Sequence, residues 1–190
     1  MPLEDDIHIR KSGKAGRITL TRPGALNAMT YDMCIAIGDA LDTWQNDDDI
    51  ELIIINAEGS RSFCAGGDIA DLYQTGKAGD YAYGRKFWRD EYRINAKIKN
   101  YPKPYIAIMD GIVMGGGVGI SAHGSHRIVT ENTLFAMPEC GIGLVPDVGG
   151  NWLLSRALGH IGEYLGATGA RLKAGDCIFA GIADLFVPEK

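Results

Sequence analysis

The chain has 190 residues, of which 46% are hydrophobic, and its formal net charge is −5. This length and composition fit one folded domain, residues 1–190, and argue against disorder. No dense Lys/Arg cluster indicates nucleic-acid binding, and no apolar run reaches the ~20 residues that a membrane span needs.

The cysteines and the N-terminus bear on the cellular setting. The four cysteines, Cys34, Cys64, Cys140 and Cys177, are widely spaced and support neither disulfides nor a zinc knuckle, which favours a reducing compartment. The opening MPLEDD lacks the parts of a secretory signal and is too acidic for a mitochondrial presequence. We therefore expect a cytoplasmic protein.

Strand and helix patterns alternate through the first half of the chain. In chain order these are strands at 7–10 and 17–21, a helix at 30–44, a strand at 51–56, a short helix at 68–73 and a longer helix at 85–100. Thr30 is the expected N-cap of the first helix. Residues 75–83 are small and polar, and we expect a mobile connection there.

The second half continues the alternation with shorter elements. These are strands at 103–109, 127–130 and 133–137, helices at 118–123, 151–159 and 163–169, a helix start at 172–176 and a short strand at 181–187. Alternating strands and helices predict an α/β fold with parallel pairing and right-handed crossovers.

Two glycine-rich turns, FCAGGD at 63–68 and MGGGVG at 114–119, follow apolar strands and lead into helices. Such a turn exposes backbone N–H groups that have no partner within the helix. Two facing turns could hold one oxygen from both sides, as an oxyanion hole does. Tight packing would explain one such turn, but two in equivalent places favour function.

A dinucleotide site is the competing interpretation of the second turn. Residues 117–122 match G-x-G-x-x-A, and Glu139 lies about twenty residues on, where a ribose-binding acid is expected. However, the following strand at 127–130 lacks an acid at its end, and the turn at 63–68 is left without a role.

Three carboxylates are candidates for chemistry. Glu139 and Asp147 lie in apolar loops shaped by Gly and Pro, where desolvation would raise a carboxyl pKa toward the range of a general acid or base. Capping of the next helix is an alternative role for Asp147, whereas the sequence after Pro138 predicts no helix start that would explain Glu139. Taken alone, Glu91 is expected on a solvated helix face.

The remaining candidates are weaker. His123 and His126 are three residues apart, but no third ligand is evident, so a metal site is not expected. No histidine is placed to activate Cys64, which is expected to be a small buried residue.

Together these motifs resemble the crotonase, or enoyl-CoA hydratase/isomerase, superfamily. The segment LTRPGALNAM at 20–29 and the two glycine turns are similar to its N-terminal segment and its oxyanion-hole turns. Further segments are similar to the 3-hydroxyisobutyryl-CoA hydrolase family within it, at 89–92, 103–107, 115–121, 134–139, 142–150 and 168–174.

The resemblance implies a ClpP/crotonase fold, a stacked β-β-α superhelical core that binds acyl-CoA. By position, the N–H groups of Gly67 and Gly116 would form the oxyanion hole, and Glu139 and Asp147 would be the catalytic carboxylates. Glu91 would join Gly116, Glu139 and Asp147 in binding the substrate. The resemblance implies no cofactor and no metal, since CoA is part of the substrate.

The implied reaction is hydrolysis of a short 3-hydroxyacyl-CoA, namely 3-hydroxyisobutyryl-CoA in valine breakdown. Hydratases of the superfamily have a catalytic glutamate where this chain has Gly119, which favours the hydrolase. Hydration or double-bond isomerisation on the same scaffold and a non-catalytic acyl-CoA-binding fragment remain alternatives. The family normally continues into a mostly helical C-terminal part that forms subunit contacts; that part is expected to be absent here, and a homo-oligomer is conceivable.

Overall fold

The computed structural model describes residues 6–188, so both ends of the expected domain, at 1–5 and 189–190, lie outside the described residues. A six-stranded sheet runs in the order β1-β2-β3-β5-β7-β9. Its strands are β1 Ile7–Ser12, β2 Ala15–Leu20, β3 Leu52–Ala57, β5 Tyr105–Met109, β7 His126–Val129 and β9 Leu185–Phe186. Only the β1–β2 hairpin is antiparallel among these pairs, which confirms the expected parallel α/β fold.

A second, three-stranded sheet has the order β4-β6-β8 and is also parallel. It consists of β4 Ser62–Cys64, β6 Ile112–Met114 and β8 Leu134–Ala136. Each long strand β3, β5 and β7 is thus followed by a short strand of this sheet and then by helix. These repeated β-β-α units confirm the stacked core. The sequence analysis missed β4 and β6, because three residues carry too little periodicity to show a strand.

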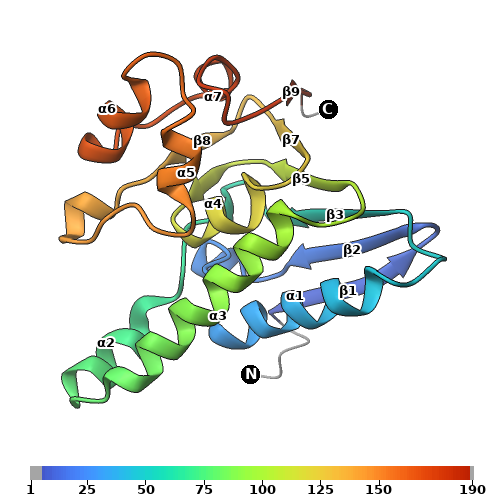
Figure 1. Cartoon of the computed structure of the whole chain (residues 1–190), viewed down its shortest axis with the longest axis horizontal. Coiled ribbons are helices and arrows are strands. Elements are labelled where there is room, and N and C mark those ends of the chain that lie inside the picture. Colours follow the sequence, from blue (N-terminus) through green and yellow to red (C-terminus); the bar gives the residue numbers. More distant parts are fainter. Residues whose placement is uncertain (1–5, 189–190) are drawn as a thin grey trace.

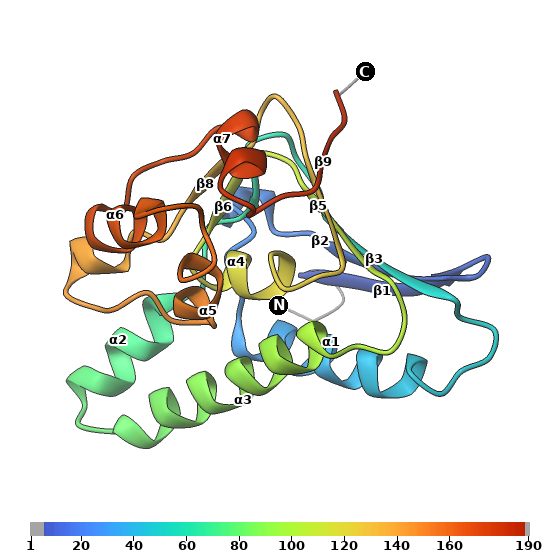
Figure 2. The same ribbon diagram turned by 45° about the horizontal axis from the view of Figure 1, so that its top comes forward.

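The helices fall into two groups (Figures 1 and 2). They are α1 Tyr31–Trp44, α2 Ile69–Lys77, α3 Tyr81–Lys99, α4 Gly116–Ser121, α5 Gly150–Leu154, α6 Ile161–Thr168 and α7 Ala174–Phe179, with 3-10 turns η2 Pro23–Ala25 and η3 Glu139–Ile142. Helices α1 and α3 run side by side below the large sheet, and α2 projects at the outer end of α3. Helices α5, α6 and α7 gather at the opposite side.

Helix α1 forms as its sequence predicts. The Thr30 hydroxyl accepts a hydrogen bond from the Met33 N–H at 3.2 Å, which caps the first turn. Its apolar stripe, including Ile37, Leu41 and Trp44, is buried in the core. Trp44 also explains Gly16, since a Cβ there would lie 2.4 Å from the indole ring.

The expected mobile connection at 75–83 is wrong. Helix α2 continues to Lys77, and α3 begins at Tyr81 after a short turn. The Asp80 carboxylate caps α3 by accepting from the Ala82 N–H at 2.9 Å. A single capped turn therefore joins the two helices, and the Asp80 cap at the start of α3 is the local signal that the sequence analysis missed.

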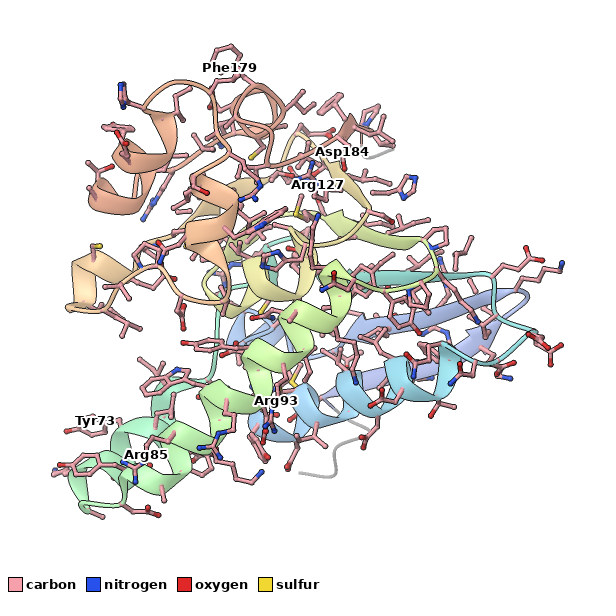
Figure 3. All side chains as sticks on the ribbon, viewed as in Figure 1. Tyr73, Arg85, Arg93, Arg127, Phe179 and Asp184 are labelled. Carbon is pink, nitrogen blue, oxygen red and sulfur yellow. The ribbon has the colours of Figure 1, made fainter. Side chains whose placement is uncertain are left out.

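The C-terminal segment is tied to the large sheet by a charged pair. The guanidinium of Arg127 on β7 donates to the Asp184 carboxylate, with one contact at 2.5 Å, just before β9 (Figure 3). The Asp184 carboxylate also accepts from the Arg127 N–H at 2.8 Å. These bonds position the two-residue strand β9 against β7.

Candidate active site

The first glycine turn leaves the end of β4 and is bound to the segment before α1. Gly66 has a φ of +121°, which favours glycine, and its carbonyl accepts from the Met29 N–H at 2.8 Å. The Asp68 N–H donates to the Met29 carbonyl at 2.8 Å. Met29 thus bonds to the two residues on either side of Gly67. The N–H of Gly67 itself has no acceptor among the described backbone groups.

Asn27 anchors the segment that holds this turn. Its buried amide donates to the carbonyls of Glu58 and Ser62, at 3.0 and 2.7 Å. Its oxygen accepts from the Arg22 N–H at 2.8 Å. Asn27 has a left-handed φ of +53°, a conformation that asparagine adopts more readily than most residues. The segment is therefore fixed to the loop and strand that lead into the glycine turn.

The second glycine turn forms the N-terminus of α4. Gly115, the N-cap of the helix, has a φ of +51°. Because glycine has no side chain, it cannot cap the helix with a side-chain hydrogen bond. All six residues of α4 are buried. As the first residue of the helix, Gly116 has an N–H with no acceptor in the preceding turn.

The two turns lie against each other. A Cβ on Gly116 would be 3.1 Å from the Gly67 nitrogen, and a Cβ on Gly66 would be 3.8 Å from the Gly116 nitrogen. The backbone donors of Gly67 and Gly116 are therefore neighbours, as the oxyanion-hole interpretation requires. Crowding against the Gly67 nitrogen gives a physical reason for glycine at Gly116, and the positive φ of Gly66 gives one there.

A cavity of about 370 Å³ opens at this junction. Its lining includes every residue predicted for the site: Gly67, Gly116, Glu91, Glu139 and Asp147. Residues from four separate parts of the chain thus meet in one cavity. Their roles in binding and catalysis stay predictions.

Glu91 is not on a solvated face, so that interpretation is wrong. It is 3% exposed on the inner face of α3, and a Cβ on Gly116 would lie 2.7 Å from its Oε1. Burial, and to a smaller extent the charge of Asp147, raise the pKa of Glu91 to about 8. The signal was present in the sequence, since Phe87, Ile94 and Ile98 place position 91 on the apolar stripe.

Glu139 begins the 3-10 turn η3, so the expectation that no helix starts there is wrong. Its side chain is buried, and its Oε2 has no hydrogen-bond partner among the described residues. Its Oε1 lies 3.2 Å from the position of a Cβ on Gly115. The pKa of Glu139 is raised to about 7. Burial is the largest cause, a hydrogen bond from its own backbone N–H opposes the shift, and the charge of Asp147 adds to it.

Asp147 faces the cavity and does not cap α5 with its side chain. Gly149 is the N-cap of that helix, and no side-chain hydrogen bond caps it. The Asp147 carboxylate instead accepts from the Tyr92 hydroxyl at 2.7 Å. The sequence analysis missed Tyr92, which follows Glu91 on α3, because no local pattern indicates a partner 55 residues away.

The other candidates have structural explanations. Cys64 is fully buried, and burial raises its pKa to about 12, as expected of a small core residue. His123 is buried with its Nε2 2.7 Å from the Val148 carbonyl, whereas His126 is exposed on β7. Among the described residues no group of three or more His, Cys, Asp or Glu side chains is arranged to hold a metal.

The glycines that suggested a dinucleotide motif serve packing. A Cβ on Gly117 would lie 2.3 Å from the Cys64 carbonyl oxygen, and a Cβ on Gly119 would lie 2.7 Å from the Asn95 amide nitrogen. Glu139 follows β8, and its Oε1 lies 3.2 Å from the position of a Cβ on Gly115, within the glycine turn itself. This arrangement does not support a ribose-binding role.

The fold is of the crotonase type, and the chain belongs to the enoyl-CoA hydratase/isomerase family, whose model matches residues 15–190. It is 50% identical over 185 residues to the mitochondrial 3-hydroxyisobutyryl-CoA hydrolase of Danio rerio, covering 97% of this chain and 48% of that protein. The human mitochondrial 3-hydroxyisobutyryl-CoA hydrolase is 46% identical over 186 residues, covering 98% of this chain and 48% of the relative.

Solved structures agree on the fold. An enoyl-CoA hydratase from Rhodobacter sphaeroides matches with a TM-score of 0.95 and 58% identity, covering 96% of this chain and 54% of that one. A carnitinyl-CoA dehydratase from Mycobacterium thermoresistibile matches with a TM-score of 0.94 and 49% identity. The match covers 97% of this chain and 54% of that one. The chain therefore spans about half the length of the relatives named above.

The comparisons correct the expected location. The vertebrate relatives are named as mitochondrial, so the expectation of a cytoplasmic protein is wrong. Cysteine spacing indicates only a reducing compartment, and it could not separate one such compartment from another. Among the described residues, no helix combines the length and apolar character that a membrane crossing requires.

Proposed function

We propose that this protein hydrolyses a short 3-hydroxyacyl-CoA thioester, and that its substrate is 3-hydroxyisobutyryl-CoA, an intermediate of valine breakdown. The observation that carries the proposal is the cavity in which two unpaired backbone donors, at Gly67 and Gly116, meet three carboxyl groups. The names of the relatives at about half identity support the choice of substrate.

In the proposed reaction, the thioester oxygen binds between the N–H groups of Gly67 and Gly116. These donors stabilise the negative charge that develops on the oxygen as the carbonyl carbon is attacked. They are fixed by the turns before any substrate arrives, so little reorganisation is needed during the reaction.

Glu139 acts on the carbonyl carbon in one of two ways. As a nucleophile, its carboxylate forms an anhydride with the acyl group while the C–S bond breaks, and water then opens the anhydride. As a general base, it takes a proton from a water molecule whose oxygen attacks directly. Either route consumes one water and yields the free acid and CoA. A pKa of about 7 leaves a substantial ionised fraction at neutral pH.

Asp147 is the acid/base partner through which a proton reaches the departing CoA sulfur. Its bond with the Tyr92 hydroxyl holds the carboxylate in one orientation toward the cavity. Glu91, with a pKa of about 8, is mostly protonated at neutral pH. It can therefore donate a hydrogen bond beside Gly116 without adding charge to the oxyanion site.

Hydration or isomerisation of an enoyl-CoA is the second candidate, because the solved relatives named above carry hydratase or dehydratase names. At Gly119, where hydratases of the superfamily have a glutamate, a Cβ would lie 2.7 Å from the Asn95 amide and 2.8 Å from the Val148 Cβ. This crowding disfavours an acid at that position, and it supports hydrolysis as the first choice.

The test is to mix the protein with 3-hydroxyisobutyryl-CoA and follow free thiol with a thiol reagent. Steady thiol release supports the proposal. Loss of the enoyl absorbance of crotonyl-CoA, with no thiol from the first substrate, would support hydration instead. Calorimetric binding of the thioester with no turnover of either substrate would indicate a non-catalytic acyl-CoA-binding fragment.

A further inference from the structure

A second cavity, of about 580 Å³, lies next to the one that holds the candidate site. Asp147 lines both cavities. The second cavity is lined further by Tyr92 and Asn95 on α3, His123 after α4, Val148, and Trp152 on α5. The Tyr92–Asp147 hydrogen bond thus stands where the two spaces adjoin.

Two buried polar side chains in this second cavity have no partners among the described residues. Asn95 is 4% exposed, yet neither its Nδ2 nor its Oδ1 makes a hydrogen bond. His123 is 5% exposed, and its Nδ1 is also unpaired. Buried polar groups in native proteins are nearly always hydrogen-bonded, so a molecule that enters the cavity is expected to pair with them.

The Asn95 amide lies close to Gly119 on α4, where there is no side chain. A Cβ on Gly119 would be 2.7 Å from the Asn95 Nδ2 and 2.8 Å from the Val148 Cβ. The amide therefore occupies the space that any larger residue at 119 would need.

Asn95 lies one helical turn away from the proposed oxyanion site. It lies one turn after Glu91 on α3, and Gly119 lies one turn after Gly116 on α4. The two helices contact each other along this stretch. One helical turn rises about 5.4 Å, which is within the reach of an acyl chain of a few carbons.

We infer that the second cavity receives the hydroxylated end of the acyl group, and that the Asn95 amide is the hydrogen-bond partner of the substrate hydroxyl. The inference rests on the proposed function. A hydroxyl both donates and accepts, and an amide offers an acceptor and two donors, so the two groups match. The apolar walls at Val148 and Trp152 suit the carbon skeleton of a short branched acyl group.

The test compares two thioesters that differ only in the hydroxyl, 3-hydroxyisobutyryl-CoA and isobutyryl-CoA. The wild-type protein is expected to prefer the first by about 10–100-fold in kcat/KM, because the second leaves the amide unpaired. Asn95→Leu is expected to reduce this preference to less than about 3-fold while it still turns over isobutyryl-CoA. The matched control is Asn46→Leu, at an exposed position after α1 that lines neither cavity, which should keep the wild-type preference.

Two results would overturn the inference while leaving the proposed hydrolysis intact: no preference in the wild type, or an unchanged preference in Asn95→Leu. If Asn95→Leu does not fold, as judged by circular dichroism, Asn95→Ala is measured by the same criteria. If the wild type hydrolyses neither thioester, the proposed function fails by itself. The inference is then tested by calorimetric dissociation constants for the two thioesters. The ratio of these constants should match the preference expected above for the wild type and for Asn95→Leu.

Discussion

The cavity at the candidate site has two halves, one of glycine backbone and one of carboxyl side chains. On one side, Gly66, Gly67 and Gly116 present bare backbone. A Cβ on Gly116 would crowd Glu91 and the Gly67 nitrogen, whereas a Cβ on Gly67 would make only an ordinary contact with Phe87. On the other side, Glu139 and Asp147 come from the region after β8 and carry the ionisable groups. The backbone half is set by close packing, whereas the carboxylate half is set by burial and charge. Changes to the two halves should therefore have different signatures.

The largest effect is expected from Glu139→Gln, which removes the ionisable group and keeps the shape of the carboxylate half. Thiol release from 3-hydroxyisobutyryl-CoA should fall by about 10²–10⁴-fold, the usual contribution of a positioned acid or base. Glu163→Gln, on the exposed helix α6, is the matched control and should leave the rate unchanged. A wild-type rate for Glu139→Gln would remove Glu139 from the mechanism.

Gly116→Ala tests the backbone half. The new Cβ would lie 2.7 Å from the Glu91 Oε1 and 3.1 Å from the Gly67 nitrogen, so the Glu91 carboxyl group must shift and the two turns must separate slightly. Displacement of one oxyanion donor should lower kcat by about 10²–10³-fold. Gly76→Ala, on α2 where a Cβ would meet nothing within 4 Å, is the control. If both variants keep wild-type kcat, the paired turns do not hold the reacting oxygen.

The pH profile of kcat/KM tests the charge of Glu139 separately from the shape of the cavity. Glu139 must be ionised to attack or to take a proton, and its pKa is raised to about 7. We therefore expect kcat/KM to rise about tenfold per pH unit below 7 and to level off above it. The Asp147 charge contributes to the raised pKa, so any residual activity of Asp147→Asn should have its midpoint at a lower pH. A midpoint near 4.5 in the wild type would contradict the burial argument.

A smaller effect is expected from Tyr92→Phe, which removes the hydroxyl that orients Asp147. Loss of one hydrogen bond to a charged group on a partly exposed residue should lower kcat by about tenfold, with little change in KM. Tyr164→Phe on the exposed face of α6 is the control. Equal kinetics in the two variants would mean that Asp147 needs no orientation from Tyr92.

The smallest effect concerns stability. An unfolded Glu91 loses its proton near pH 4.5, but the folded protein retains it up to about pH 8. The folded state therefore binds more protons between these values, and the free energy of unfolding falls as pH rises through them. Glu91→Gln has no charge to bury, so its Tm should exceed the wild-type value by about 2–4 °C at pH 9 and match it at pH 4. Thermal unfolding at both pH values checks this, and a uniform shift would point to packing instead.

The backbone half could be predicted from the sequence better than the carboxylate half. Glycines at 66–67 and 115–117 follow apolar runs, and such local patterns predict turns directly. The apolar stripe of α3 indicates that Glu91 is buried, but its position beside Gly116 depends on how α3 packs against α4. The Tyr92–Asp147 bond joins residues far apart in sequence. Strands β4 and β6 gain their order from neighbours in the small sheet, because three residues have no stable conformation alone.

Helix α2 forms part of the cavity wall through Ile69 and Leu72, yet none of its residues is buried. Ile69 and Tyr73 are more than half exposed on this projecting helix. Replacing its side chains should therefore cost little folding free energy, in contrast to the glycine turns. A library of variants at 69 and 72 can therefore reshape this wall of the cavity without changing the groups that are proposed to react.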